Sequence, residues 1–368
     1  MNCKMMIVGA AVAAAGNVFA GLYGDTPDAK HAWAVHDRNR PNPVKVESAK
    51  EIGQPPSDAV VLFDGTKASL EANWVDGKGN PTKWTYDEAE RAFQVQRGAG
   101  AIFTKAKFGD CQLHIEFKHP ANISGGGQMR GNSGVFLMNN YEIQVMESYL
   151  TNPADMKMPN YADGQCGAVY AENPPLVNAN RPAGEWQVYD IVFHQPVWEG
   201  RTLVHPGSVT VFLNGVLVQD HWEMEGLTTH CRRRPLAPHA PTGPLQLQDH
   251  GCPVFYRNVW YRPLASRWAN TTHSALSAKE EDVMALRRQT AEALFAKIAK
   301  PEEPTAENVK ALAEVISYAN EGKYAETFKK CLEAYRAKAD KPEKEVKAVN
   351  AALAVLTRNR VVDVEQVK

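Results

Sequence analysis

Short segments that alternate apolar and polar residues recur through the middle of the chain, and they constrain its fold most strongly. In residues 111–118 every second residue is apolar, a period of two that predicts a β-strand with one buried face. Residues 209–213 and 216–218 are two apolar segments separated by Asn214-Gly215, the dipeptide typical of a tight hairpin turn. Both patterns predict antiparallel strands.

Further segments of the same kind follow one another between turn residues. They cover residues 60–63, 134–138, 141–147, 188–194, 245–250 and 259–261. Many short strands with turns between them and no helical period predict a mainly β fold. We therefore expect a two-sheet antiparallel jelly-roll sandwich of the concanavalin A-like type over residues 58–264.

The spacing of apolar residues changes beyond Ser266. Apolar residues then recur three or four positions apart in four segments, which predicts helices. The segments lie near residues 275–299, 309–319, 324–335 and 346–356. Proline and glycine separate them, so residues 265–368 are expected to form a small helical bundle or cap. No residue in this part looks catalytic, and docking of a partner or a homo-oligomer contact is the role left open for it.

The first twenty residues have the features of a secretory signal peptide. Lys4 precedes an apolar run over residues 5–15, and the segment ending at Ala20 has small or apolar residues where a signal peptidase reads. The run is too short to span a membrane, so we expect cleavage after Ala20 and a secreted or periplasmic protein, with no transmembrane segment. Residues 21–57 are polar and rich in proline, which predicts an extended arm around the next domain or, alternatively, a disordered linker.

The charge balance excludes some classes of partner. Lys and Arg number 41 against 42 Asp and Glu, for a net charge of −1, so nothing indicates binding to nucleic acid or to an anionic membrane. The five cysteines after residue 20 are irregularly spaced, which favours isolated thiols over a disulfide framework. At most, two of Cys166, Cys231 and Cys252 would pair.

The most informative polar residues lie in residues 141–147. As a strand, this segment places Tyr141 on an apolar face and Glu142 with Gln144 on the other. A carboxylate and an amide held two residues apart on a rigid strand suit a site that grips hydroxylated ligands and moves a proton. The plain alternative is a half-solvated strand.

A second carboxylate, Glu147, suggests a conventional glycosidase. Glu142 and Glu147 resemble the carboxylate pair of β-sandwich glucanases, which sit about 5 Å apart in retaining enzymes. A spacing of five places the two on opposite faces of a strand unless a bulge intervenes, and Gln144 replaces the Asp found between them. This interpretation is the weaker one.

Two other alternating segments offer polar faces. Glu116 and Lys118 share a face in the first, and Gln248 with His250 share one in the second. If both strands lie in the curved inner sheet beside Glu142, the three polar faces meet in one groove. The polar loop over residues 124–133 would then lie at its rim. Singly, each residue would be interpreted as ordinary surface.

Metal binding has little local support. The chain has no His-x-x-x-His, no clustered carboxylates and no cysteine pair. The sequence therefore indicates no particular cofactor. A divalent cation held by scattered residues such as Glu116, Glu142 and His250 stays open.

An ordered set of motifs resembles a known family. The motifs are Leu62-Phe63-Asp64-Gly65-Thr66, Leu113-His114-Ile115-Glu116-Phe117-Lys118, Asn132-Ser133-Gly134-Val135-Phe136-Leu137, Tyr141-Glu142-Ile143-Gln144-Val145, Gly167-Ala168-Val169-Tyr170, Glu185-Trp186-Gln187-Val188-Tyr189-Asp190, Leu213-Asn214-Gly215, Leu247-Gln248-Asp249-His250-Gly251 and Phe255-Tyr256-Arg257-Asn258-Val259-Trp260. Together they resemble the 3-keto-disaccharide hydrolase domain family over about residues 58–264. The arm and the helical part lie outside the resemblance.

The resemblance implies a concanavalin-like sandwich that cleaves glycosides already oxidised to a ketone at C3. Such a ketone acidifies the C2 proton, so a base can remove it, the aglycone can leave from C1, and water can then add. The catalytic candidates are Glu142, His250 and Glu116, with His250 or Glu142 transferring the proton. The substrate-binding candidates are Asn132, Gln144, Gln248, Lys118 and Tyr141, with Lys118 able to polarise the ketone.

Two other classes of function remain. The same sandwich serves non-catalytic carbohydrate-binding modules, because a fold does not settle a function. A structural or interaction protein presented by the helical part is the third candidate. Release of an aglycone from 3-keto-glycosides would distinguish the enzyme from the carbohydrate-binding module and from the interaction protein.

Overall fold

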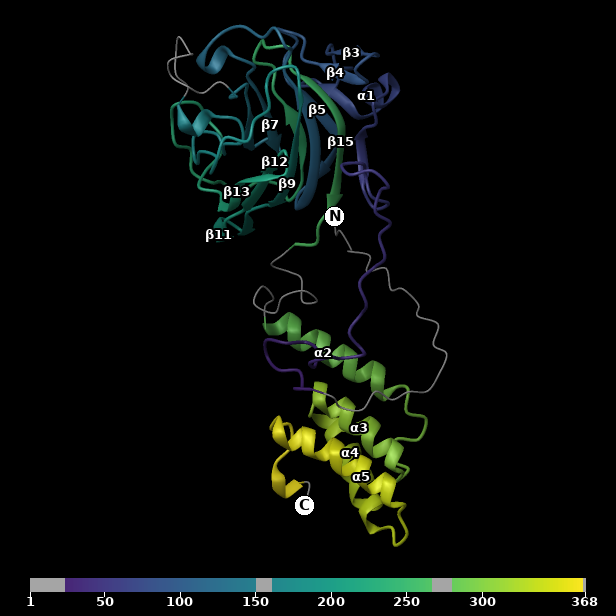
Figure 1. Ribbon diagram of the computed structural model, residues 1–368. Coiled ribbons are helices and arrows are strands. Elements are labelled where there is room, and N and C mark those ends of the chain that lie inside the picture. Colours follow the sequence, from purple (N-terminus) through teal and green to yellow (C-terminus); the bar gives the residue numbers. More distant parts are fainter. Residues whose placement is uncertain (1–23, 150–160, 267–279, 367–368) are drawn as a thin grey trace. The chain divides into compact units, whose positions relative to one another are not determined.

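The computed structural model describes residues 24–149, 161–266 and 280–366 (Figure 1). The chain divides into two compact units, each described by itself below. One comprises residues 44–267, and the other comprises residues 1–43 with 268–368. The predicted signal peptide lies outside the described residues.

The first unit contains a large antiparallel sheet. Its strands are β1 (Val60–Phe63), β3 (Thr85–Asp87), β4 (Ala92–Gln94), β6 (Cys111–Lys118), β9 (Trp186–His194), β12 (Ser208–Leu213), β13 (Val216–Glu223) and β15 (Phe255–Pro263). The order is β13-β12-β9-β6-β15-β4-β3, with β1 also paired to β15. Asn214 and Gly215 both have positive φ, 55° and 81°, so the turn between β12 and β13 is the tight hairpin that the sequence predicts.

A second antiparallel sheet packs against the first. Its strands are β2 (Trp74–Asp76), β5 (Ile102–Phe108), β14 (Gly243–Leu247), β7 (Ser133–Leu137) and β8 (Tyr141–Val145), in the order β2-β5-β14-β7-β8. Short elements complete the unit. They are α1 (Lys67–Asn73), the ribbon of β10 (Val197–Glu199) and β11 (Thr202–His205), and the 3₁₀ turns Gly127–Met129 and Ala162–Gly164.

The core lies between the two sheets. Ile115 of β6, Ile143 of β8 and Leu247 of β14 are all fully buried in one apolar cluster. Because side chains alternate along a strand, the polar residues of β6 and of β8 point away from this core. They therefore lie on opposite outer faces of the sandwich. The predicted two-sheet sandwich is confirmed.

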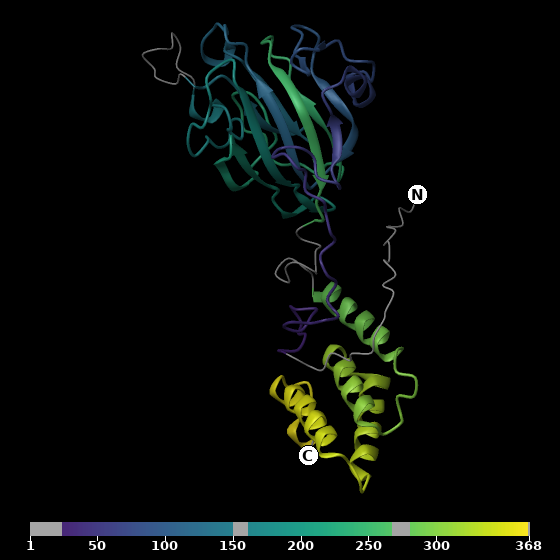
Figure 2. The same cartoon turned by 45° about the vertical axis from the view of Figure 1, so that its right-hand side comes forward.

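The second unit is helical (Figure 2). Its helices are α2 (Glu280–Phe295), α3 (Ala306–Tyr318), α4 (Gly322–Ala337) and α5 (Glu343–Arg358), followed by a 3₁₀ turn at Val364–Gln366. Thr305 caps α3 by accepting a hydrogen bond from the amide of Asn308, and α3 packs against the other three helices. The predicted helical C-terminal part is confirmed, although residues 275–279 of its first segment lie outside the described residues.

The N-terminal arm contributes to both units. Asn39 Nδ2 donates to Glu314 Oε1 at 2.6 Å and so holds the arm to α3. Gly53 O accepts hydrogen bonds from Asn258 Nδ2 and Trp260 Nε1 at 2.8 and 2.9 Å on the large sheet. No helix among the described residues is long and apolar enough to cross a membrane. All five cysteines that the structure describes are free thiols.

Candidate functional site

The carboxylate of Glu142 is the most unusual polar group of the smaller sheet. Its neighbours Tyr141 and Ile143 point into the core, so Glu142 points to the outer face of β8. Glu142 is only 3% exposed, and burial raises the pKa of its carboxyl to about 8. Room for it comes from Gly134 on β7, where a Cβ atom would collide with Glu142 Oε1. A buried carboxyl of this kind can exchange a proton near neutral pH.

Four amide side chains surround the same face. Gln128 Oε1 accepts from Asn132 Nδ2 at 2.8 Å and from Gln144 Nε2 at 3.2 Å, which fixes the orientation of both amides. Asn132 Oδ1, Gln144 Oε1 and Gln248 Oε1 are buried and have no hydrogen-bond partner. Unpaired buried acceptors are costly, and the hydroxyl groups of a sugar are suitable donors for them.

A segment that runs along the free edge of β8 brings Tyr170 to this face. Val169 forms a bridge with Ile143 and shares its core, so Tyr170 is the cross-strand neighbour of Glu142 on the outer side. The backbone amide of Tyr170 donates to Glu142 O at 3.1 Å. The motif containing Tyr170 is visible in the sequence, but nothing in it indicates that this tyrosine lies opposite Glu142.

Other candidates on this sheet have different surroundings. Gln248 follows β14, and its amide donates to Gly134 O at 3.1 Å, which places it beside Glu142 as predicted. His250 lies two residues further, in the loop beyond β14, and its side chain is exposed. Tyr141 is fully buried, and its hydroxyl forms a 2.7 Å hydrogen bond with His239 Nε2. The ring of Tyr141 belongs to the core, and its predicted role in substrate binding stays a prediction.

Glu147 lies beyond the end of β8 and is 2% exposed. Its carboxylate forms an ion pair with Arg130, whose guanidinium also donates to Ile123 O at 3.2 Å. This pairing ties Glu147 to the loop that carries Asn132. It is a structural contact, in agreement with the strand parity that separates Glu147 from Glu142.

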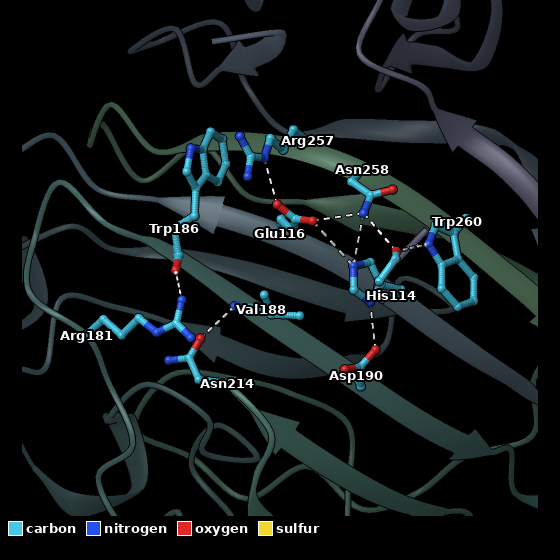
Figure 3. Close-up of polar contacts among 11 residues, drawn as sticks. His114, Glu116, Arg181, Trp186, Val188, Asp190, Asn214, Arg257, Asn258 and Trp260 are labelled. Carbon is cyan, nitrogen blue, oxygen red and sulfur yellow. Dashed lines mark hydrogen bonds and ion pairs between the residues drawn. The ribbon is translucent and has the colours of Figure 1, made fainter. Parts of the chain in front are cut away.

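Glu116 and Lys118 lie on the outer face of the large sheet, on the far side of the core. Arg257 Nε donates to Glu116 Oε2 at 2.6 Å, and Asn258 Nδ2 donates to Oε1 at 2.8 Å (Figure 3). His114 Nδ1 bonds to Asp190 Oδ1 at 2.7 Å.

The ionisation of Glu116 follows from these contacts. Burial acts to raise its pKa, but hydrogen bonds from His114, Asn258 and Arg257 outweigh burial and lower the pKa to about 2. A carboxylate that is ionised and paired throughout the neutral range is a poor proton-transfer group. Lys118 is likewise engaged, in a 2.6 Å ion pair with Glu90.

The prediction that the three polar faces meet in one groove is therefore wrong. Strand parity separates the two faces of each strand, but it does not say to which sheet a strand belongs. Glu142, Gln144, Asn132 and Gln248 come together on the smaller sheet, whereas Glu116 and Lys118 lie on the other. The cation site suggested for Glu116 with Glu142 and His250 is not formed, and the described residues contain no group of three or more His, Cys, Asp or Glu side chains that could hold a metal ion.

Comparison with solved structures finds several chains that are similar to part of this one. A protein of Parabacteroides distasonis described as a "putative glycosyl hydrolase" is 39% identical, with 61% of this chain and 93% of that chain covered and a TM-score of 0.55. A second protein of that organism with the same description is 20% identical, with coverage of 60% and 100% and a TM-score of 0.42. An alginate lyase from a Chlorella virus is 11% identical, with coverage of 50% and 89% and a TM-score of 0.28.

Comparison with family models confirms the family that the sequence motifs resemble. No curated protein matches the chain. The model of the 3-keto-alpha-glucoside-1,2-lyase-like domain matches residues 58–262, more than half of the chain. This match begins just before β1 and ends within β15, so it spans both sheets and the Glu142 face. The chain therefore belongs to the 3-keto-alpha-glucoside-1,2-lyase-like domain family.

Proposed function

We propose that this protein cleaves 3-keto-glycosides by removing the C2 proton, with Glu142 as the base. The family and the glycosyl hydrolase-like neighbour support a carbohydrate-active protein. The observation that carries the proposal is a buried carboxyl on the outer face of β8, beside three buried amide oxygens without partners. The combination supplies a proton acceptor together with a surface that binds hydroxyl groups.

The reaction follows from the ketone at C3. The carboxylate of Glu142 takes the C2 proton, and the electron pair of that bond forms a C1=C2 double bond. The bond between C1 and the glycosidic oxygen breaks, and the aglycone leaves with the electron pair of that bond and takes a proton from an acid in the site. Water then adds its hydroxide to C1 and gives its remaining proton back to that acid, while the proton of Glu142 returns to C2, so that the net reaction is hydrolysis.

The amides have a separate task. Asn132, Gln144 and Gln248 would accept hydrogen bonds from sugar hydroxyls and fix the ring with its C2 proton towards Glu142. The raised pKa of Glu142 makes its carboxylate a stronger base than an ordinary one. A base whose pKa lies near the working pH balances proton affinity against the fraction that is ionised.

The direct experiment uses a panel of 3-keto-glycosides and their unoxidised parent glycosides, with and without a chelator. We expect release of the aglycone from the oxidised compounds alone. Binding of the unoxidised oligosaccharides without product from the oxidised ones would instead identify a carbohydrate-binding module. Cleavage of the parent glycosides would identify a conventional glycosidase.

A further inference from the structure

Two tyrosines and a histidine form a hydrogen-bonded chain next to Glu142. The hydroxyl groups of Tyr161 and Tyr170 lie 2.7 Å apart. The Tyr170 hydroxyl lies 2.8 Å from His230 Nδ1, and His230 Nε2 lies 3.1 Å from Cys231 Sγ. Tyr170 is buried, whereas Tyr161 is 41% exposed, so a ligand can reach the hydroxyl group of Tyr161 at its end of these hydrogen bonds.

The tyrosine chain is tied to the proposed site at two points. Tyr170 is the cross-strand neighbour of Glu142. The ring of Tyr161 packs on Gly164, where a Cβ atom would collide with it, and Gly164 O accepts from Gln144 Nε2 at 3.3 Å. Tyr170 also lines a pocket of about 220 Å³ with Thr229.

The elimination described above needs a second proton-transfer group. Glu142 removes a proton from C2, but the aglycone oxygen must gain one as the bond to C1 breaks, and an alcohol is a poor leaving group without it. We propose that Tyr161 is the acid that protonates the leaving oxygen, with Tyr170 and His230 as positioning residues that hold it. This inference rests on the proposed function.

Protons balance over the whole cycle. Tyr161 gives its proton to the aglycone oxygen and becomes a phenolate, which accepts a hydrogen bond from the Tyr170 hydroxyl. In the hydration step the phenolate takes a proton from the attacking water, while Glu142 returns its proton to C2. Tyr161 and Glu142 both end in their starting states, and water is the one reagent consumed besides the substrate. Burial raises the pKa of Tyr161, which keeps the phenol protonated at neutral pH.

The test separates the two proton transfers by the choice of leaving group. Tyr161→Phe and wild type are compared on a 4-nitrophenyl 3-keto-glucoside, whose phenol leaves without an acid, and on a 3-keto-disaccharide, whose alcohol does not. We expect the variant to lose roughly 10²-fold or more in rate on the disaccharide and less than about tenfold on the nitrophenyl compound. A loss of equal size on both would overturn the role of Tyr161.

Solvent deuterium gives a second readout that a structural role would not change. Without the acid, Glu142 still removes the C2 proton, but the aglycone cannot leave, so the proton exchanges. In D₂O the Tyr161→Phe variant should incorporate deuterium at C2 of unreacted disaccharide faster than it releases the aglycone. Exchange and release reduced by the same factor would contradict the proposal.

Three further variants test the positioning role of His230 and provide a control. The Tyr170 hydroxyl donates to Tyr161, so His230 Nδ1 must donate to the Tyr170 oxygen. His230→Asn keeps a donor near the position of Nδ1 and should retain most of the disaccharide activity, which His230→Leu should lose. Tyr86→Phe is the matched control, because its hydroxyl donates to Gly65 O at 2.9 Å on the other sheet. A wild-type protein that cleaves neither substrate would instead refute the proposed function itself.

Discussion

The carboxylate of Glu142 occupies the space above Gly134 that a Cβ atom would fill. Gly134→Ala should therefore displace Glu142 and reduce kcat/KM on a 3-keto-glycoside by roughly 10- to 10³-fold, because proton transfer depends on placement. The overpacking should lower the free energy of unfolding by about 1–3 kcal/mol, which leaves the protein folded at 25 °C. Steady-state kinetics and thermal unfolding check both expectations.

Gly77→Ala is the control for this variant. Gly77 follows β2 in the same sheet, and the nearest atom to an added Cβ is Phe103 Cε2 at an ordinary 3.5 Å. The Gly77→Ala variant should keep wild-type kinetics. If Gly134→Ala were equally active, the carboxylate would not need its observed position.

The buried carboxyl of Glu142 should make stability depend on pH. Its folded pKa of about 8 lies above the ordinary 4.5, so the unfolded state loses the proton first. Its contribution to stability is complete below pH 4.5 and is lost as pH rises to about 8, by up to roughly 5 kcal/mol at about 1.4 kcal/mol per pKa unit. Glu142→Gln should thus gain in Tm over wild type between pH 5 and pH 8. If the difference in Tm between Glu142→Gln and wild type stayed constant over this pH range, the pKa of Glu142 in the folded protein would be ordinary.

The ion pair of Glu147 with Arg130 should be structural. Glu147→Gln leaves Arg130 without its partner, in surroundings where its side chain is only 18% exposed. A loss of about 3 kcal/mol in unfolding free energy is expected, because a broken buried pair leaves a charge uncompensated. The folded variant should still turn over a 3-keto-glycoside at a rate within about threefold of wild type. Complete loss of kcat at unchanged Tm would instead favour the glucanase-like pair.

Glu116 should matter for stability and not for turnover. Its folded pKa of about 2 lies below 4.5, so the stabilisation is present above pH 4.5 and is lost as pH falls through 2. Glu116→Gln should lower Tm at pH 7, and the difference should shrink as the pH is lowered through this range. Kinetics at 25 °C should match wild type, whereas a large fall in kcat would return Glu116 to the catalytic groups.

Much of the fold follows from local patterns. Alternation predicts the strand at residues 111–118 with its observed bounds, and Asn214-Gly215 predicts the hairpin because both residues tolerate positive φ. Helical spacing predicts the four helices, since one apolar stripe of each is buried in a common core. These features depend on residues that are close in sequence.

The site is predicted less completely, because it depends on which strands become neighbours. Alternation places Glu142 and Gln144 on one face, and the structure agrees. The same alternation does not show that Glu116 belongs to the other sheet. The strands that pair with the strand of Glu116 are distant from it in sequence, so a local pattern cannot identify them. Tyr170 is missed for the same reason, because it approaches Glu142 only through the edge segment that pairs with β8.

The most direct test of the central claim is the rate of C2 proton removal by wild type and Glu142→Gln. The substrate is a 4-nitrophenyl 3-keto-glucoside with hydrogen or deuterium at C2, and nitrophenol release is followed from pH 6 to pH 9 after subtraction of the spontaneous reaction. We expect a primary isotope effect in wild type, a kcat/KM that rises to a plateau above a pKa of about 8, and a loss of roughly 10²- to 10⁴-fold in Glu142→Gln. A variant that keeps the wild-type rate, isotope effect and pH profile would contradict the account.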